Sequence, residues 1–481
     1  MAITELIAAI ELGSSKISGI AGKKNEDDSL QVLAYTKVDS SSFIKKGVVY
    51  NLEQTSQAIK TIVQGLEATL QSKIAKVYVG IGGQSVRTLK NVINRNLGDQ
   101  QVLISQERVD SVCDENIELP ITNGRTILEV SPQEFKIGND YSIDPVGIAG
   151  KQIEGHFMNI VAQETLKSSL EHSFKLAEVE IADLLVSPLA TANLLLSESD
   201  KKAGCALVDF GAETTTVSVY KNELLRFLSV IPLGGDNITR DLTSFKIDKE
   251  RAEYLKLKVA DLNYTLNESE EEEDEETCFL DKEKTRKVPL LDINNIIKAR
   301  AEEIIANVWN QIQLSGYHDE LNAGITITGG ASNLVGLKDL IQKTTRINRI
   351  KIGNTHKEII HSKLVKELKD QEAPNSLFTL IGLLSMGDMN CAKVEKVTDR
   401  KLFEGEEFIE KQEKTPEEIL KEQLLAKKEA EEKERRERKR KEEEEKAKRK
   451  KKNKGFLHKS MRKIEQFQKN LFNEDNPTNK D

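Results

Sequence analysis

Residues 206–217 read ALVDFGAETTTV, and residues 7–17 read IAAIELGSSKI. Each segment has an apolar run, an acid (Asp209 or Glu11), a turn with glycine and small hydroxylated residues, and a second apolar run. This order predicts a β-hairpin in each segment, because short apolar runs bounded by such turns are typical of buried strands. The acids stand 198 positions apart (209 minus 11), and two copies of one hairpin indicate two similar half-domains that face each other.

The two turns have the composition of a phosphate-binding loop. Glycine allows close approach of a ligand, Ser or Thr adds a donor, and successive backbone N–H groups can converge on an anion. Acids at the strand ends could orient water around a Mg²⁺ ion, and a lysine could neutralise phosphate charge. Acid-x-glycine turns also occur in ordinary hairpins, so neither turn predicts a phosphate site alone. The candidate residues are Glu11, Gly13, Ser14, Ser15 and Lys16 in the first hairpin, and Asp209, Gly211, Thr214 and Thr215 in the second.

A third motif, ITITGGASNL, occupies residues 325–334. It predicts a buried strand that ends in Gly329-Gly330, followed by a helix start near Asn333. Backbone without side chains at Gly329 and Gly330 could lie flat against a nucleobase or a ribose. Two successive glycines more often mark a plain tight turn, so this motif alone does not indicate a nucleotide site. It indicates one only in combination with the two hairpins.

The chain between the motifs alternates short β-rich runs with helical periodicity, which predicts an α/β architecture. The expected strands are Leu6–Ile10, Ile17–Ala21, Val77–Ile81, Cys205–Phe210, Thr216–Tyr220 and Gly324–Thr328. The expected helices are Leu52–Leu70, Gln163–Ala177, Asn294–Ser315 and Ser376–Met386.

In this order and at these separations, the three motifs resemble the two phosphate motifs and the adenosine motif of the actin, heat-shock chaperone and sugar-kinase superfamily. Within it, the chain is similar to the FtsA family of actin-like bacterial cell-division proteins, over about residues 5–392 and again at a C-terminal helix. The resemblance implies an actin-like two-domain fold that binds ATP with Mg²⁺, and it adds Gly234, Gly235, Glu253 and Lys256 to the nucleotide site. Further similar segments are SSFIKKGVV (41–49), VYVGIGGQS (77–85), LLVSPLATAN (184–193), IPLGGDNITRD (231–241) and APNSLFTLIGLLSM (373–386).

The resemblance also implies a division into subdomains. The first actin-like domain takes residues 1–85 and 166–200 with a returning helix at 374–390, and 86–165 form an inserted family-specific subdomain. The second domain takes 201–240 and 301–373, together with a subdomain at 241–300 that carries the acidic insertion 268–276. Residues 393–454 are expected to be a charged linker, and 455–472 an amphipathic membrane-targeting helix.

As to function, the resemblance implies a division-site adaptor, and at most a slow ATPase. It implies assembly into actin-like filaments, contact with other division proteins, and binding of the C-terminal tail of the tubulin-like division protein FtsZ near Arg300 and Glu303. These two side chains lie three residues apart on one helical face and suit a peptide with both charge signs, although an ordinary surface ion pair has the same spacing. The second turn departs from the family's glycine-rich form at Ala212 and Glu213. An inward-pointing Glu213 would repel phosphate, which puts fast hydrolysis in doubt.

The C-terminal region has a composition of its own. Residues 427–454 hold 16 Lys and Arg and 9 Glu, a balance of +7, so the rest of the chain is near −15 (−8 minus +7). On a helix of 3.6 residues per turn, seven apolar side chains after this region fall in one arc of about 160° and the basic residues fall outside it. The pattern predicts a helix that lies in an anionic membrane surface. The apolar residues are Phe456, Leu457, Met461, Ile464, Phe467, Leu471 and Phe472.

Other functions remain open on the sequence alone. A heat-shock chaperone would need a β-rich substrate domain after residue 392, and a sugar kinase a substrate-facing catalytic aspartate; neither stands out. The basic region could serve a nucleic-acid adaptor, but its interleaved glutamates dilute the field and we expect no nucleic-acid partner. Four scattered cysteines predict a reducing compartment without a structural metal. With no cleavage-site pattern and no apolar stretch of about 20 residues, we expect peripheral contact with the cytoplasmic face of the membrane.

Overall fold

The protein is described by a computed structural model that covers residues 6–25, 29–118, 124–264, 276–281, 285–355, 359–360 and 374–393. The chain forms two compact units. Of the described residues, 6–91, 124–133 and 157–393 belong to the first unit, and 92–118 and 134–156 to the second. The first unit contains two sheets, which we call lobe 1 and lobe 2 together with their helices. The α/β architecture expected from the sequence is confirmed.

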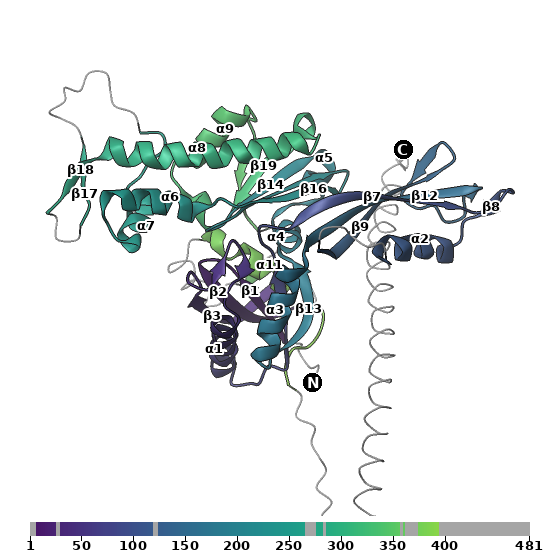
Figure 1. Cartoon of the computed structure of the whole chain (residues 1–481), viewed down its shortest axis with the longest axis horizontal. Helices are drawn as coiled ribbons and strands as arrows, with labels where there is room; N and C mark the ends of the chain where they lie inside the picture. Colours follow the sequence, from purple (N-terminus) through teal and green to yellow (C-terminus); the bar gives the residue numbers. More distant parts are fainter. Residues whose placement is uncertain are drawn as a thin grey trace, which may run out of the picture. The chain divides into compact units, whose positions relative to one another are not determined.

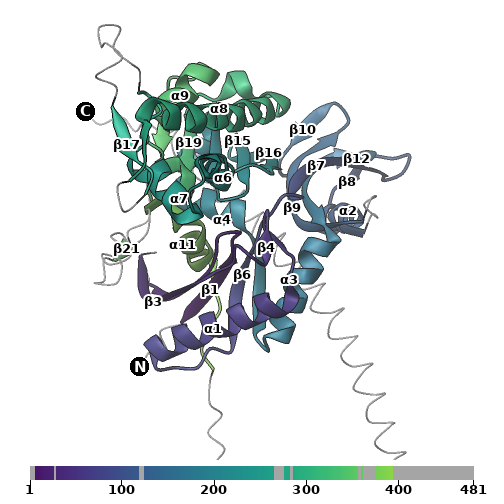
Figure 2. The ribbon, with the colours of Figure 1, turned by 60° about the vertical axis from the view of Figure 1, so that its left-hand side comes forward.

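Lobe 1 is built on the first predicted hairpin. Strands β1 and β2 pair antiparallel, with Glu11 opposite Ser18 and Leu12 opposite Ile17, while β6 joins β1 in parallel. Figure 2 shows this sheet from its side. The strand order is β13 (Glu180–Val186), β6 (Lys76–Ile81), β1 (Ile7–Leu12), β2 (Lys16–Lys24), β3 (Leu30–Asp39) and β21 (Ile359–Ile360).

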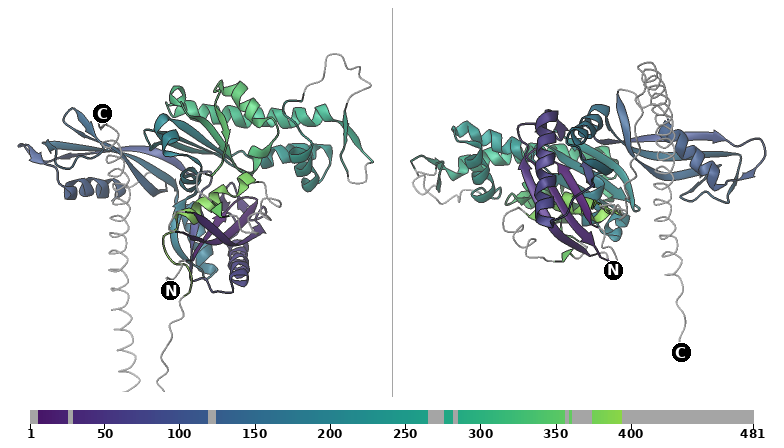
Figure 3. Two further views of the ribbon diagram at one scale, coloured as in Figure 1. Left: turned by 180° about the vertical axis from the view of Figure 1, so that it is seen from behind. Right: turned by 90° about the horizontal axis from the view of Figure 1, so that it is seen from below.

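Helices cover both faces of the lobe 1 sheet. On one face lies α1 (Leu52–Leu70), which begins where the Asn51 side chain accepts a hydrogen bond from the Gln54 N–H and ends at Gln71 in the left-handed region. The view from below in Figure 3 shows α1 along the purple strands. Its apolar side packs Ile59, Ile62 and Leu66 into the core. Further helices of this lobe are α3 (Glu164–Leu176), α4 (Ser187–Leu195) and α11 (Phe378–Met386), with α11 packed on α4, β1 and β2; the short α5 (Glu198–Ala203) leads into lobe 2.

Lobe 2 is built on the second predicted hairpin. β14 and β15 pair antiparallel with Asp209 opposite Thr216, and β19 joins β14 in parallel. Residues of β14 alternate between two cores: Ala206 and Val208 pack toward α8, while Cys205 and Leu207 join the core of lobe 1. The strand order is β16 (Leu224–Ile231), β15 (Thr215–Lys221), β14 (Cys205–Phe210), β19 (Gly324–Thr328) and β20 (Ile350–Ile352).

The helices of lobe 2 are α6 (Gly235–Leu242), α7 (Lys249–Lys258), α8 (Leu290–Leu314) and α9 (Leu337–Thr345), with α8 the long helix in Figure 1. Helix α8 begins four residues before the predicted Asn294, because Pro289 precedes it and Asp292 occupies its first turn. Helix α11 begins at Phe378 rather than at the predicted Ser376, since Pro374–Ser376 form a 3₁₀ turn. Small hairpins β4–β5 (Ile44–Lys45, Val48–Val49) and β17–β18 (Thr277–Phe279, Lys287–Pro289) complete the unit.

The second unit contains strands and one helix. The chain enters and leaves it within β7 (Arg87–Asn96), β9 (Arg125–Ile137) and β12 (Gln152–Gln163), and β10 (Asp140–Ser142) lies at the sheet edge. Helix α2 (Gln106–Glu118) buries Val109 and Val112, and β8 (Val102–Leu103) pairs with β11 (Ala149–Gly150). Among the helices of the described ranges, none combines the length and the apolar character that a membrane span requires.

Candidate functional site

A cleft of about 400 Å³ opens in the first unit where the two hairpin turns meet. Its volume lies in the range of small-molecule sites in proteins. Residues of both lobes line it, so the repeat that the sequence shows becomes two facing walls in the structure. Of the candidate residues, those that line the cleft are Glu11, Gly13, Ser14, Ser15, Lys16, Asp209, Gly211, Thr214, Gly235, Glu253, Lys256, Gly329 and Gly330.

The two turns share one backbone geometry. The Gly13 N–H donates to the Lys16 carbonyl at 3.1 Å, and the Gly211 N–H donates to the Thr214 carbonyl at 2.9 Å. In each turn this hydrogen bond closes a tight loop directly after the strand, whose second-last residue is the acid. The same local sequence plan therefore produces the same local structure twice.

The two acids carry unusual pKa values. Burial raises the pKa of Glu11 to about 8; the Asp209 charge acts in the same direction and Lys16 in the opposite one. Burial also raises the pKa of Asp209 to about 6, although a hydrogen bond with Thr379 acts to lower it. A carboxyl pair that resists ionisation in the ligand-free protein is an environment in which a bound cation would favour the charged form.

The third wall is the turn after β19. Gly329 has φ +88, and a Cβ atom there would lie 2.3 Å from Asp209 Oδ1 and 2.4 Å from the Phe210 carbonyl oxygen. Gly329 thus lets this turn approach the acid of the second hairpin. A Cβ atom at Gly330 would meet nothing within 4 Å, so this residue leaves the cleft open.

Helices α6 and α7 hold a buried lysine, paired with Glu253, at the side of the cleft. The Lys256 side chain is only 3% exposed, and its Nζ donates to the Gly235 carbonyl at 3.2 Å, Thr239 Oγ1 at 2.8 Å and Glu253 Oε2 at 2.6 Å. Three acceptors hold the ammonium in one place, as a buried charge requires.

Three of the predicted nucleotide residues lie behind the lining rather than in it. Thr215 is buried, and its Oγ1 donates to the Leu233 carbonyl at 2.8 Å. A Cβ atom at Gly234 would lie 2.6 Å from the Gly211 and Ala212 carbonyl oxygens, so this glycine allows α6 to begin close to the second turn. The Asn333 side chain donates to the Gly330 carbonyl at 2.9 Å. These residues shape the walls.

The hairpin of β4 and β5 also reaches the cleft, which sequence reasoning missed. Ser14 Oγ accepts a hydrogen bond from the Gly47 N–H at 2.8 Å, and Glu213 Oε2 accepts one from the Lys46 N–H at 2.6 Å. Glu213 therefore contacts this hairpin and is not among the lining residues. Gly47, Gly82 and Gly83 line the cleft; they stand in segments that the resemblance marked without assigning them a role.

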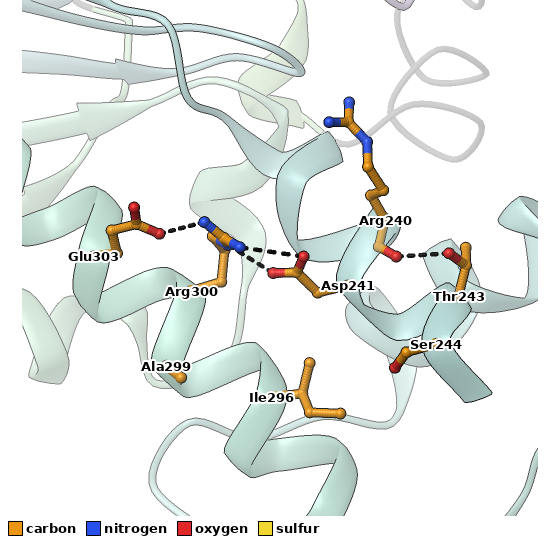
Figure 4. A pocket seen from close by; sticks show the side chains of 8 residues that line it. All are labelled: Arg240, Asp241, Thr243, Ser244, Ile296, Ala299, Arg300 and Glu303. Atoms are coloured by element: carbon orange, nitrogen blue, oxygen red, sulfur yellow. Dashed lines mark hydrogen bonds and ion pairs between the residues drawn. The ribbon is translucent and has the colours of Figure 1, made fainter.

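A second pocket, of about 660 Å³, lies between α6 and α8. Arg300 sits between two acids: its Nε donates to Asp241 Oδ2 at 2.6 Å and its Nη2 to Asp241 Oδ1 at 3.2 Å, while Nη1 pairs with Glu303 (Figure 4). Arg240, Ile296 and Ala299 also line the pocket, so charges of both signs stand beside apolar surface. The predicted membrane residues, Phe456 to Phe472, lie outside the described residues.

A two-lobed unit with duplicated acid–turn hairpins around one cleft defines an actin-like fold. The solved structure titled "PilM-PilN type IV pilus biogenesis complex" shares this fold with a TM-score of 0.52 at 16% identity, and the match covers 79% of this chain and 97% of that one.

The sequence models "Cell division protein FtsA" and "SHS2 domain inserted in FTSA" match residues 206–373 and 83–161. "Cell division protein FtsA" of Porphyromonas gingivalis is 29% identical over 360 residues, 73% of this chain and 74% of that protein. Its counterpart in Bacillus subtilis is 28% identical over 348 residues, 72% of this chain and 78% of that protein. The chain belongs to the FtsA family, and it is a cell-division protein with an actin-like fold.

Proposed function

We propose that the protein binds ATP with Mg²⁺ in the cleft between its lobes. The observation that carries this proposal is the meeting of Glu11 and Asp209, each followed by a glycine turn, at the floor of one cleft. The turns of Gly13 and Gly211 would receive the phosphates from opposite sides. The Gly329-Gly330 turn and α7 would receive the nucleoside.

The donors present fit a hydrated magnesium ion. Mg²⁺ prefers oxygen ligands and keeps several of its waters, so carboxylates can hold it through water. When bound, the ion would neutralise charge on the phosphates. Glu11 and Asp209 would hold its water shell, and Lys16 and the turn N–H groups would orient the phosphates.

Calorimetry with Mg-ATP tests this assignment. Asp209→Ala removes one of the two charges beside the ion, and we expect at least tenfold weaker binding with the fold intact. The control is Asp319→Ala, since the Asp319 side chain is 89% exposed on the same lobe. If a folded Asp209→Ala protein bound Mg-ATP with unchanged affinity, the proposed position of the Mg²⁺ ion beside Asp209 would be wrong.

We propose further that the pocket beside Arg300 receives the C-terminal tail of FtsZ. A carboxylate of the peptide would replace Asp241 on the guanidinium, and a basic side chain would meet Glu303. The paired exchange Arg300→Glu with Glu303→Arg should weaken binding of an FtsZ tail peptide about tenfold or more in fluorescence anisotropy. The matched control exchanges Lys298 and Glu302 on the same helix, outside the pocket-lining residues.

The adaptor role joins these two sites to the membrane. The segment 455–472 would lie on the anionic inner surface of the membrane at the division site, and self-assembly into filaments would multiply this weak contact. Nucleotide in the cleft would then act on assembly, with chemistry at most slow. An FtsZ peptide that binds neither in solution nor on vesicles would contradict the adaptor role.

A further inference from the structure

The hydroxyl of Ser18 is an unexplained polar group in the cleft. Ser18 is 3% exposed, and its Oγ atom has no hydrogen-bond partner within the part of the chain that the structure describes. It nevertheless belongs to the residues that line the cleft. Buried hydroxyls in proteins nearly always have a partner, so this one indicates a bound species that the fold is built to receive.

The strand fixes the direction of this hydroxyl. A Cβ atom at Gly19 would lie 2.3 Å from Ile62 and 3.2 Å from Leu66, both in α1, so Gly19 faces that helix. Neighbouring residues of a strand face opposite sides, and Ser18 therefore faces away from α1, toward the cleft. In register it stands directly opposite Glu11, which places the two side chains next to each other on one face.

The second hairpin repeats this arrangement. Asp209 stands opposite Thr216 in the β14–β15 register, and both line the same cleft. Each lobe thus presents an acid beside a hydroxyl, and the two pairs face one volume. A carboxylate accepts hydrogen bonds and a hydroxyl both donates and accepts, which is a set of partners suited to the waters of a hydrated cation.

We propose that Ser18 is a positioning residue of the cleft, whose hydroxyl holds a water of the hydrated Mg²⁺ ion that enters with the nucleotide. This inference rests on the proposed nucleotide function. The inference means that strand β2 helps to bind the hydrated metal ion, whereas the turn before it binds phosphate.

Ser18→Ala separates this role from a structural one. Because the hydroxyl has no partner among the described residues, its removal should leave the ligand-free protein as stable as before or raise its melting temperature by about 1–3 °C. Ser14→Ala is the contrast: Ser14 Oγ accepts the Gly47 N–H, and its loss should lower the melting temperature. A clear loss of stability in Ser18→Ala would show a structural hydroxyl and overturn the inference.

The binding experiment uses a fluorescent ATP analogue titrated with excess Mg²⁺ and, separately, with EDTA. We expect Ser18→Ala to weaken binding about three- to tenfold with Mg²⁺ and to leave binding in EDTA unchanged. Ser15→Ala, in the phosphate turn, should weaken binding in both conditions. Equal losses for Ser18→Ala in both conditions, or no loss with Mg²⁺, would overturn the inference and leave the proposed nucleotide site standing. A wild-type protein that binds the analogue in neither condition would instead refute the proposed function.

Discussion

At the scale of single residues, Gly329 and Gly330 are neighbours with different tasks. Gly329 has positive φ and lies against Asp209 and Phe210, whereas Gly330 has open space beside its Cα. The sequence shows two identical glycines, and only the turn geometry tells them apart. This difference predicts that a substitution at Gly329 lowers stability, whereas a substitution at Gly330 weakens ligand binding.

We expect Gly329→Ala to lower the free energy of unfolding by at least about 1–2 kcal/mol, because an L side chain is strained at positive φ and the new methyl group meets backbone. Gly330→Ala should change the free energy of unfolding by less than about 1 kcal/mol, yet weaken nucleotide binding, since its methyl group enters the cleft. Chemical denaturation and nucleotide titration of both variants measure this. Equal stability of the two variants would contradict the assigned backbone roles.

Glu213 shows what residue-level reasoning could and could not reach. Its position in the turn raised the expectation that it could point inward and repel phosphate. Its carboxylate instead accepts from the Lys46 N–H and lies 3.8 Å from the Lys45 ammonium. This partner comes from a segment 167 positions earlier, so no local pattern could indicate it. The place of the acids and glycines at the turns could be inferred from the hairpin pattern, whereas their role in nucleotide binding stays a prediction.

At the scale of elements, prediction succeeded where the signal is local. Both hairpins follow from an apolar run, a turn and a second run, and α1 has the predicted bounds because Asn51 and Gln71 mark its ends. The start of α8 was misplaced by four residues, although Pro289 marks it and Leu290, Ile293 and Ile297 already have helical spacing. Strands β4 and β5 reach the cleft through contacts between segments that are distant in the sequence. No local sequence pattern could predict this contribution.

The joint between β6 and the segment after α11 offers a test of how elements are held together. Tyr78 is 1% exposed; its hydroxyl donates to Asp388 Oδ1 at 2.7 Å and accepts from the N–H groups of Asp388 and Met389 at 3.0 and 2.9 Å. We expect Tyr78→Phe to lower the free energy of unfolding by about 1–3 kcal/mol, since it leaves polar groups without their partner. Tyr254→Phe, at a side chain that is 50% exposed, is the control.

Thermal and chemical unfolding of the two variants measure this difference in stability. A Tyr78→Phe protein as stable as the control would mean that water replaces the hydroxyl and that the joint is held by apolar packing alone.

At the scale of the whole molecule, charge and apolar surface are distributed unevenly along the chain. The first 426 residues and the end beyond 454 together carry about −15, while 427–454 carry +7. An acidic body is repelled by an anionic membrane, and a basic region followed by an amphipathic segment is attracted to one. The charge distribution therefore predicts that membrane contact is made by the C-terminal region rather than by the body.

The last prediction tests that division of labour on intact protein. In the helix predicted for segment 455–472, Phe467 lies within the apolar arc and Gln466 lies on the polar side. Phe467→Glu places a charge where acyl chains would be and removes about 1 kcal/mol or more of apolar burial, so it should release the protein from anionic vesicles. Gln466→Glu adds the same charge toward the headgroups and should weaken binding only by its electrostatic share, on the order of 1 kcal/mol.

Co-sedimentation with anionic vesicles, in the presence and absence of Mg-ATP, reports both sites at once. Both variants should retain wild-type nucleotide affinity, because the substitutions lie far along the chain from every residue of the cleft. A single C-terminal segment should bind the vesicle weakly and reversibly. If the protein self-assembles, several segments bind at once, and vesicle binding should rise steeply with protein concentration. Equal vesicle binding by the Phe467→Glu and Gln466→Glu proteins, or retained binding by a chain that ends at Lys454, would place the membrane contact on the body of the protein.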